Sequence, residues 1–220
     1  MEKDRLFHSC DVYYTFNESM QKFEGHLDYK DYLYRSISEV TPFVIYEEEL
    51  KRLNNYLVLI LKNSTQQKQA EIDWANKITP DGNFISYGEI ELVKNEVQSK
   101  WLLNINQVLF STGITLLLSF LESCFYDLTH WLNPSSNIKK IKGNKIEKYL
   151  DSLNKTLGTQ MYLSKQIQES RKIRNKFIHN QLDFNEVQEK ELRYTMDAVV
   201  ELLLEVEHAM IEKGKLVKYL

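Results

Sequence analysis

The chain has 220 residues, of which 43% are hydrophobic and 27% are charged, so its composition is that of a globular protein with a hydrophobic core. It contains only 7 glycines and 3 prolines, and because these residues mark turns, few and long elements are expected, which favours helices. The two cysteines, Cys10 and Cys124, form no disulfide framework, and the first residues include no apolar run of signal-peptide length. Both features predict a cytoplasmic protein and argue against secretion.

The formal net charge of −3 hides an uneven distribution of charge along the chain. Residues 138–176 contain eleven Lys or Arg against three acidic residues, whereas the remainder contains 17 basic and 28 acidic residues. A basic segment within an acidic protein is suited to contact phosphate groups. A solvated, lysine-rich helix face is the alternative interpretation, and charge alone favours it.

The first part of the chain is predicted to be mostly helical. Residues 18–40 are expected to form a helix, although tyrosines and charges alternate irregularly there. A clearer helix is predicted over residues 43–62, with Pro42 at the first helical position, where its missing N–H is not needed. A second helix is predicted over residues 65–78, ended by the Thr-Pro-Asp-Gly turn at 79–82.

A much longer helical pattern begins at Ser86. Ser86 and Glu89 match a capping box, in which each side chain accepts a hydrogen bond from the backbone of the other. Apolar residues then recur at helical spacing over residues 90–132, as far as the Asn-Pro pair that ends at Pro134. The pattern predicts either one very long helix or two helices with a bend near Gly113.

The most apolar stretch of the chain is residues 108–125. Glu122 and several Ser and Thr residues interrupt it, so it falls short of the roughly twenty clean apolar residues that a membrane span needs. We therefore expect a buried core helix and no membrane partner.

Three further helices are predicted in the C-terminal part of the chain. They cover residues 144–158, residues 160–180, and a last helix capped by Asn185 with Gln188 three residues later. The last helix carries a stripe of apolar residues spaced alternately three and four apart, which is suited to pack along a neighbouring helix. The stripe consists of Leu192, Met196, Val199, Leu203, Val206 and Met210.

The predicted fold class is therefore all-α, a helical bundle with long antiparallel helices. The only strand signal is a short run at residues 83–86. We divide the chain into an N-terminal, mostly helical extension, residues 1–85, and a helical bundle, residues 86–220.

The segment with the clearest chemical content is Arg174-Asn175-Lys176-Phe177-Ile178-His179. On a helix, Arg171, Asn175 and His179 lie four residues apart and form a polar strip, whereas Arg174 falls on the apolar side. A lone buried charge is costly, so Arg174 must meet an acid, a backbone carbonyl or a phosphate. A guanidinium fork suits phosphate oxygens well.

These residue types form a minimal set for cleaving RNA without a metal. His179 can transfer protons to and from RNA oxygens, Arg174 can stabilise the charged transition state, and Asn175 can orient either group. Arg171, Lys172 and Lys176 are candidate RNA contacts. The other histidines show no metal-ligand spacing, so neither a metal nor a cofactor is expected.

The hexapeptide resembles the R-x4–6-H signature of HEPN domains, in the form with a polar residue directly after the Arg. The resemblance covers roughly residues 86–213, and the order of helices also matches. It implies a HEPN-like bundle and a metal-independent endoribonuclease of a toxin–antitoxin, abortive-infection or CRISPR-associated antiviral defence system. It further implies a homodimer in which both motifs line one cleft, with Arg174 and His179 as the catalytic pair. An antitoxin or a sensor protein is a possible further partner.

Two other hypotheses stay open, because the HEPN group also contains members without nuclease activity. The first is a non-catalytic helical module that binds RNA or a protein partner through the same face. The second is a helical interaction protein built around the apolar stripe of the last helix, with no role in nucleic-acid binding. A structural interpretation of the motif also stays open, in which Arg174 pairs with an acid such as Glu205 or Glu122 and His179 is a surface residue near a helix end.

Overall fold

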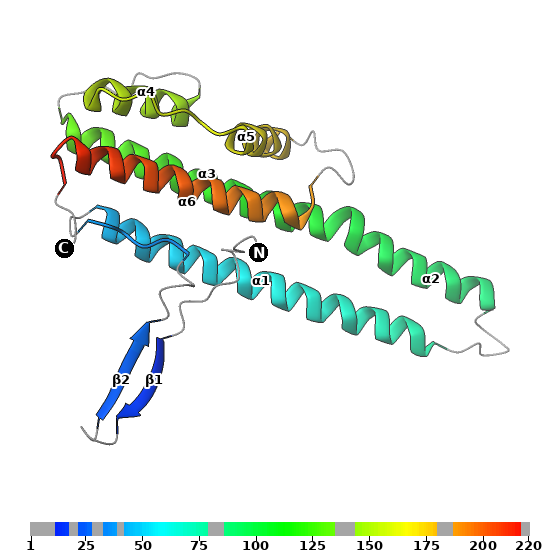
Figure 1. The fold of residues 1–220 in the computed structure, drawn as a ribbon. Coiled ribbons are helices and arrows are strands. Elements are labelled where there is room, and N and C mark those ends of the chain that lie inside the picture. The colour runs from blue at the N-terminus through cyan, green and yellow to red at the C-terminus, as the bar shows by residue number, and fades with distance from the viewer. Residues whose placement is uncertain are drawn as a thin grey trace.

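A computed structural model describes residues 12–17, 22–27, 33–38, 42–78, 86–134, 144–179 and 187–216. Six α-helices account for most of these residues, which confirms the all-α class (Figure 1). The elements are β1 (Val12–Asn17), β2 (Lys22–Leu27), α1 (Phe43–Lys77), α2 (Tyr87–Ser99), the π-helical segment η3 (Lys100–Ile105), α3 (Asn106–Leu132), α4 (Lys145–Leu157), α5 (Lys165–Ile178) and α6 (Glu189–Glu212).

The helix predicted over residues 18–40 is wrong where the structure describes this region. Strands β1 and β2 pair antiparallel, with Val12 opposite Leu27 and Asn17 opposite Lys22. Only β2 lies inside the predicted helix, and it pairs with β1, which precedes that range and is rich in the aromatic and β-branched residues that suit a strand. These are the only strands among the described residues, and the short strand run expected at residues 83–86 lies almost wholly outside them.

Helix α1 is one continuous helix of 35 residues, so the two separate helices predicted here were wrong. The polar run around Thr65 suggested a break, but the Thr65 hydroxyl donates a hydrogen bond to the carbonyl of Leu61, 2.9 Å away and one turn earlier. Such bonding satisfies a Ser or Thr side chain inside a helix. Pro42 is the N-cap rather than the first helical residue, and the turn at residues 79–82 lies outside the described residues.

Helices α2 and α3 form the predicted long helical stretch, and the interruption lies in the π-helical turn η3 rather than near Gly113. The capping box of Ser86 and Glu89 is confirmed. Trp101 in η3 is buried, and its indole N–H donates to the carboxylate of Glu71 in α1 at 2.8 Å. This bond joins the π-helical turn to α1, which runs alongside α2 and α3.

Gly113 matters for packing, because α3 comes close to α1 and α6 at this residue. A Cβ atom on Gly113 would lie 2.8 Å from a methyl carbon of Leu192 and 3.2 Å from a methyl carbon of Leu57. Gly88, in contrast, has open space around it, with the nearest atom 4.0 Å away in Ser86. The two helical glycines therefore differ in their tolerance of a side chain.

We expect Gly113→Val to lower the free energy of unfolding by about 2 kcal/mol, because the added methyl groups overpack the contact between α1, α3 and α6. Gly88→Ala is the matched control and should raise it by roughly 0.5 kcal/mol through its better helix propensity. Urea unfolding followed by circular dichroism measures both changes. A Gly113→Val protein as stable as the parent would show that the three helices do not pack as described.

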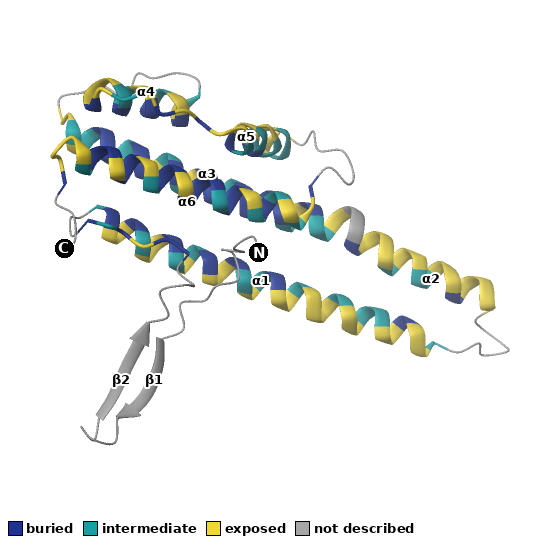
Figure 2. Cartoon of the chain, in the orientation of Figure 1, coloured by how far each residue is buried: buried dark blue, intermediate teal, exposed yellow. Residues whose placement is uncertain are grey.

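The core is centred on α3, which packs against α4, α5 and α6, while α1 runs along the opposite side of the α3–α6 pair (Figure 1). Figure 2 shows buried residues concentrated along α3 and α6. All six residues of the predicted stripe on α6 are buried, which confirms its role in packing. By length and composition α3 could also cross a membrane, but half of its most apolar window is buried inside the protein.

The C-terminal helices begin and end close to the predicted positions, with two differences. Helix α4 is confirmed from its cap at Asn144 to Gly158, which adopts a left-handed conformation. Helix α5 begins later than predicted, after its N-cap Ser164. Helix α6 is capped by Gln188 rather than by Asn185, which lies outside the described residues.

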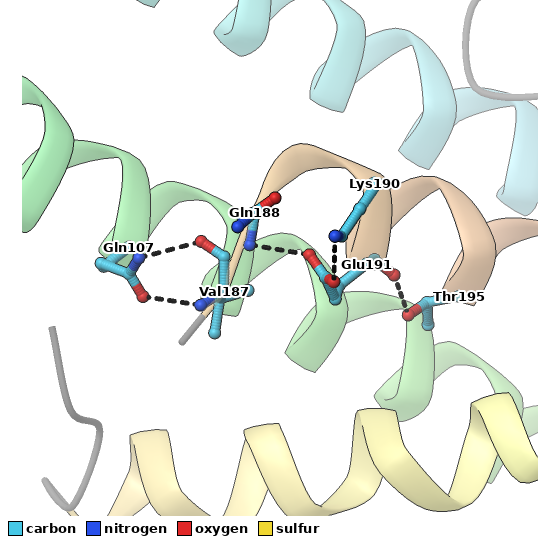
Figure 3. Close-up of polar contacts among 6 residues, drawn as sticks. All are labelled: Gln107, Val187, Gln188, Lys190, Glu191 and Thr195. Atoms are coloured by element: carbon cyan, nitrogen blue, oxygen red, sulfur yellow. Dashed lines mark hydrogen bonds and ion pairs between the residues drawn. The ribbon is translucent and has the colours of Figure 1, made fainter. Parts of the chain in front are cut away.

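Figure 3 shows how the start of α6 is held against α3. The side-chain amide of Gln107 donates to the carbonyl of Val187 at 2.9 Å and accepts from its N–H at 3.1 Å. The backbone N–H of Gln188 donates to the carboxylate of Glu191 at 2.8 Å, and Lys190 lies 3.8 Å from the same carboxylate. These bonds satisfy donors that the first turn of a helix otherwise leaves unpaired.

The segment of residues 33–38 is attached to α6 by one buried carboxylate. Glu207 is fully buried and accepts hydrogen bonds of 2.7 Å from the hydroxyls of Ser36 and Ser38. The hydroxyl of Tyr34 donates at 2.9 Å, and the backbone N–H groups of Ile37 and Ser38 donate at 3.0 Å. Burial is the main cause of the raised pKa of Tyr34, and the charge of the nearby Glu207 carboxylate raises it further. This phenol therefore stays protonated and donates.

Candidate functional site

Helix α5 carries the Arg-Asn-x-x-x-His motif, and two polar contacts fix how the helix sits on the bundle. At its N-terminus, the Ser164 hydroxyl accepts a hydrogen bond from the backbone N–H of Ile167 at 3.3 Å. One turn before the motif, the buried hydroxyls of Ser170 and Thr195 lie 2.7 Å apart and join α5 to α6. With one face fixed in this way, the direction in which each motif residue points is determined by the helical repeat.

Arg174 lies on the inward side of α5, as predicted, with 18% of its side chain exposed. Its Nη1 atom is 3.5 Å from Oε2 of Glu122 in α3, a long contact. Glu122 also accepts a hydrogen bond from Nζ of Lys145 in α4, at 2.9 Å, and its own side chain is 22% exposed. This hydrogen bond raises the pKa of Lys145. One carboxylate thus links cations from α4 and α5, and the acid expected if Arg174 is structural is present.

The guanidinium of Arg174 nevertheless keeps unused hydrogen-bonding capacity. Its Nε atom is buried and has no hydrogen-bond partner among the residues that the structure describes. A guanidinium carries five N–H donors, so a single contact at 3.5 Å leaves donors without a protein partner, and the 18% of the side chain that is exposed is the part that a ligand can reach. The surroundings of Arg174 therefore allow both a structural ion pair and a contact with phosphate.

Along the polar strip beside Arg174, the side chains become more exposed toward the C-terminal end of α5. Arg171 is half-buried, and its Nη1 atom is 3.8 Å from the carboxylate of Glu147 in α4. Burial lowers the pKa of Arg171, and the charge of Glu147 partly opposes this change. Asn175 and His179 are both exposed, and their side chains have no partner in the described part of the chain.

His179 is the C-cap of α5, and its backbone N–H donates to the carbonyl of Asn175 at 3.1 Å. Its exposed ring is accessible to a substrate. It is also the surface position near a helix end that the non-catalytic hypothesis expects.

The structure places the six predicted site residues on one helix but on two sides of it. Arg171, Lys172 and Asn175 line a cavity of about 330 Å³ between α4 and α5, whereas Arg174 and His179 do not line it. Lys172 is exposed and pairs with Glu169 at 2.8 Å, and Lys176 is half-buried. The predicted site residues therefore lie in three places: Arg174 faces inward, His179 is exposed, and three others line the neighbouring cavity.

Sequence reasoning missed part of the surroundings of the motif. Glu122 was considered as one possible partner of Arg174, but nothing indicated that Lys145 would share its carboxylate. Tyr162, which lies in the connection between α4 and α5, was not identified as a site residue although it lines the cavity. An aromatic residue between two basic helices was the available signal for it.

Neither a family model, nor a curated protein, nor a solved structure matches this chain. Among the residues that the structure describes, no group of three His, Cys, Asp or Glu side chains could hold a metal ion. The functional interpretation therefore depends on the site itself.

Proposed function

We propose that this protein is a metal-independent endoribonuclease of a prokaryotic defence or toxin–antitoxin system, in which Arg174 and His179 carry out the chemistry. The observation that supports the proposal most is the placement of the motif on α5. The arginine lies partly buried with an unpaired Nε atom, and the histidine is exposed at the end of the same helix.

In this mechanism His179 acts as general acid–base on the attacking 2′-hydroxyl or on the leaving oxygen of the RNA. Arg174 binds the scissile phosphate and stabilises the charge that develops on it, and Asn175 orients one of the two. Attack by the 2′-hydroxyl forms its bond to phosphorus as the bond to the 5′-oxygen breaks. The products are a 2′,3′-cyclic phosphate and a 5′-hydroxyl.

A homodimer would complete such a site. On a single chain, Arg174 points into the bundle and His179 outward, one and a half turns apart. Two α5 helices that face each other would bring the exposed His179 of both copies to one cleft, which the exposed part of each Arg174 could border, so we include a homodimer in the proposal.

We expect purified protein to cleave a labelled RNA in EDTA, and His179→Ala to cleave it at least about 100-fold more slowly. His208→Ala is the matched control, because His208 is an exposed histidine on α6 outside the motif. Gel analysis of the labelled RNA gives the rates. Equal cleavage by His179→Ala and the parent would rule out His179 as the acid–base residue.

The second candidate function is a non-catalytic helical module that binds RNA or a protein partner. It is favoured by the contact between Arg174 and Glu122, which gives the arginine a partner without any ligand. A complex with RNA that weakens steeply as salt rises, with no cleavage, would support this alternative.

A further inference from the structure

The cavity between α4 and α5 is not explained by the chemistry of Arg174 and His179. Its volume of about 330 Å³ lies at the lower end of the range for small-molecule sites. Its wall combines an aromatic ring, two carboxylates and two cations, contributed by Tyr162, Asp151, Glu147, Arg171 and Lys172. This combination of groups is suited to a nucleotide rather than to an apolar ligand.

Tyr162 lies in a part of the connection between the two helices that is held in place. The side chain of Asn154 donates to the carbonyl of Met161 and accepts from its N–H, both at 2.8 Å. It also accepts from the hydroxyl of Thr159 at 3.0 Å. The side chains of Met161 and Leu163 are buried, while Tyr162 between them is 74% exposed. A ring exposed on a fixed backbone is a stacking platform for a base.

The carboxylate of Asp151 is a charged acceptor on the cavity wall that is available to a ligand. Asp151 is exposed and has no hydrogen-bond or ion-pair partner within the described ranges. The other acid of the cavity, Glu147, is already engaged by the side chain of Asn144 and lies 3.8 Å from Arg171. A free carboxylate accepts hydrogen bonds and donates none, so it selects ligands with adjacent N–H donors.

Among the four RNA bases, guanine presents two N–H donors side by side, at N1 and N2, and can bind a carboxylate through both. Adenine, cytosine and uracil each place an acceptor next to their donor, which a carboxylate repels. On the α5 side of the cavity, the Arg171 side chain is partly exposed with Nη1 only 3.8 Å from Glu147, and Lys172 is held only by an exposed ion pair. These cations can contact the phosphate of the same nucleotide.

We propose that this cavity binds one guanine base of a single-stranded RNA, stacked on Tyr162 and hydrogen-bonded to Asp151. The inference rests on the proposed function, which supplies RNA as the ligand. It adds that a site next to the cleavage residues selects one base. It assigns Tyr162 and Asp151 as binding residues, and Arg171 and Lys172 as contacts to the phosphate of that nucleotide.

The test is binding of two fluorescent oligouridines in EDTA, one with a single central guanosine and the other with adenosine there. The His179→Ala protein is used so that the RNA stays intact. The guanosine oligonucleotide should bind about tenfold tighter, and Asp151→Asn should remove this preference.

Tyr162→Ala should weaken both complexes about tenfold, whereas Tyr162→Phe, which keeps the ring, should not. Tyr87→Ala, an exposed tyrosine on α2, is the control.

Equal affinity for the two oligonucleotides would overturn the inference, as would a guanosine preference that survives Asp151→Asn. Cleavage by the parent chain is measured separately, so the two proposals can fail independently. Cleavage without a base preference would leave the nuclease proposal standing and remove the guanine site. A guanosine preference without cleavage would support the guanine site and count against the nuclease proposal.

Discussion

Replacing Glu207 with alanine is expected to lower the free energy of unfolding by roughly 4 kcal/mol. The change removes the acceptor shared by three hydroxyls and two backbone N–H groups. The Ser36 hydroxyl and the Ser38 N–H keep bonds within the segment, but the buried Tyr34 hydroxyl loses its acceptor. Because residues 33–38 contact α6 through this carboxylate, the loss should also release that segment. Chemical unfolding and hydrogen exchange at Ile37 and Ser38 measure the two effects.

Glu205→Ala is the control for this experiment, because Glu205 is an exposed glutamate on the same helix. It should change stability by no more than a few tenths of a kcal/mol. Stability unchanged by Glu207→Ala would mean that the segment is not attached to α6 through this residue.

Replacing Arg174 with alanine is expected to slow RNA cleavage by about 10³-fold, because the donors that stabilise the phosphate are lost in the transition state. The contact with Glu122 offers a way to separate catalysis from structure. Glu122→Gln removes the negative charge but keeps the shape, so it should leave Arg174 in place and free to bind phosphate. We therefore expect Glu122→Gln to retain cleavage.

Single-turnover cleavage and thermal unfolding of both variants should be measured side by side. If the ion pair is purely structural, both substitutions will destabilise the protein. The cleavage rate will then fall only in proportion to the share of the protein that is folded. A large loss of cleavage in folded Arg174→Ala protein, with Glu122→Gln active, is the result expected for a catalytic arginine. Similar losses in both folded variants would contradict this role.

Local signals were sufficient to predict most of the helical bundle. The capping box at Ser86, the Asn144 cap and Gly158 each act over a few residues, so their effects can be read directly from the sequence. The apolar stripe of α6 was also predictable, because its periodicity reports one buried face. The inward position of Arg174 follows from the same helical repeat.

Features that depend on distant residues were predicted less well. The pairing of β1 with β2 was missed, because a strand depends on a partner that the local pattern does not show. The continuity of α1 through Thr65 ran against the polar run there. For the site, the helical repeat could place Arg174 but could not show that Lys145 shares Glu122 with it. It also could not show that Tyr162 faces a cavity, because that position results from the hydrogen bonds of Asn154.

The most direct test of the central claim is the chemistry of the RNA ends produced by the protein in EDTA. A mechanism based on Arg174 and His179, with attack by the 2′-hydroxyl, predicts 2′,3′-cyclic phosphate and 5′-hydroxyl ends, and no inhibition by the chelator. Mass spectrometry of the fragments distinguishes these ends from others. Products with 3′-hydroxyl and 5′-phosphate ends, or cleavage that stops when divalent metal is removed, would contradict the account.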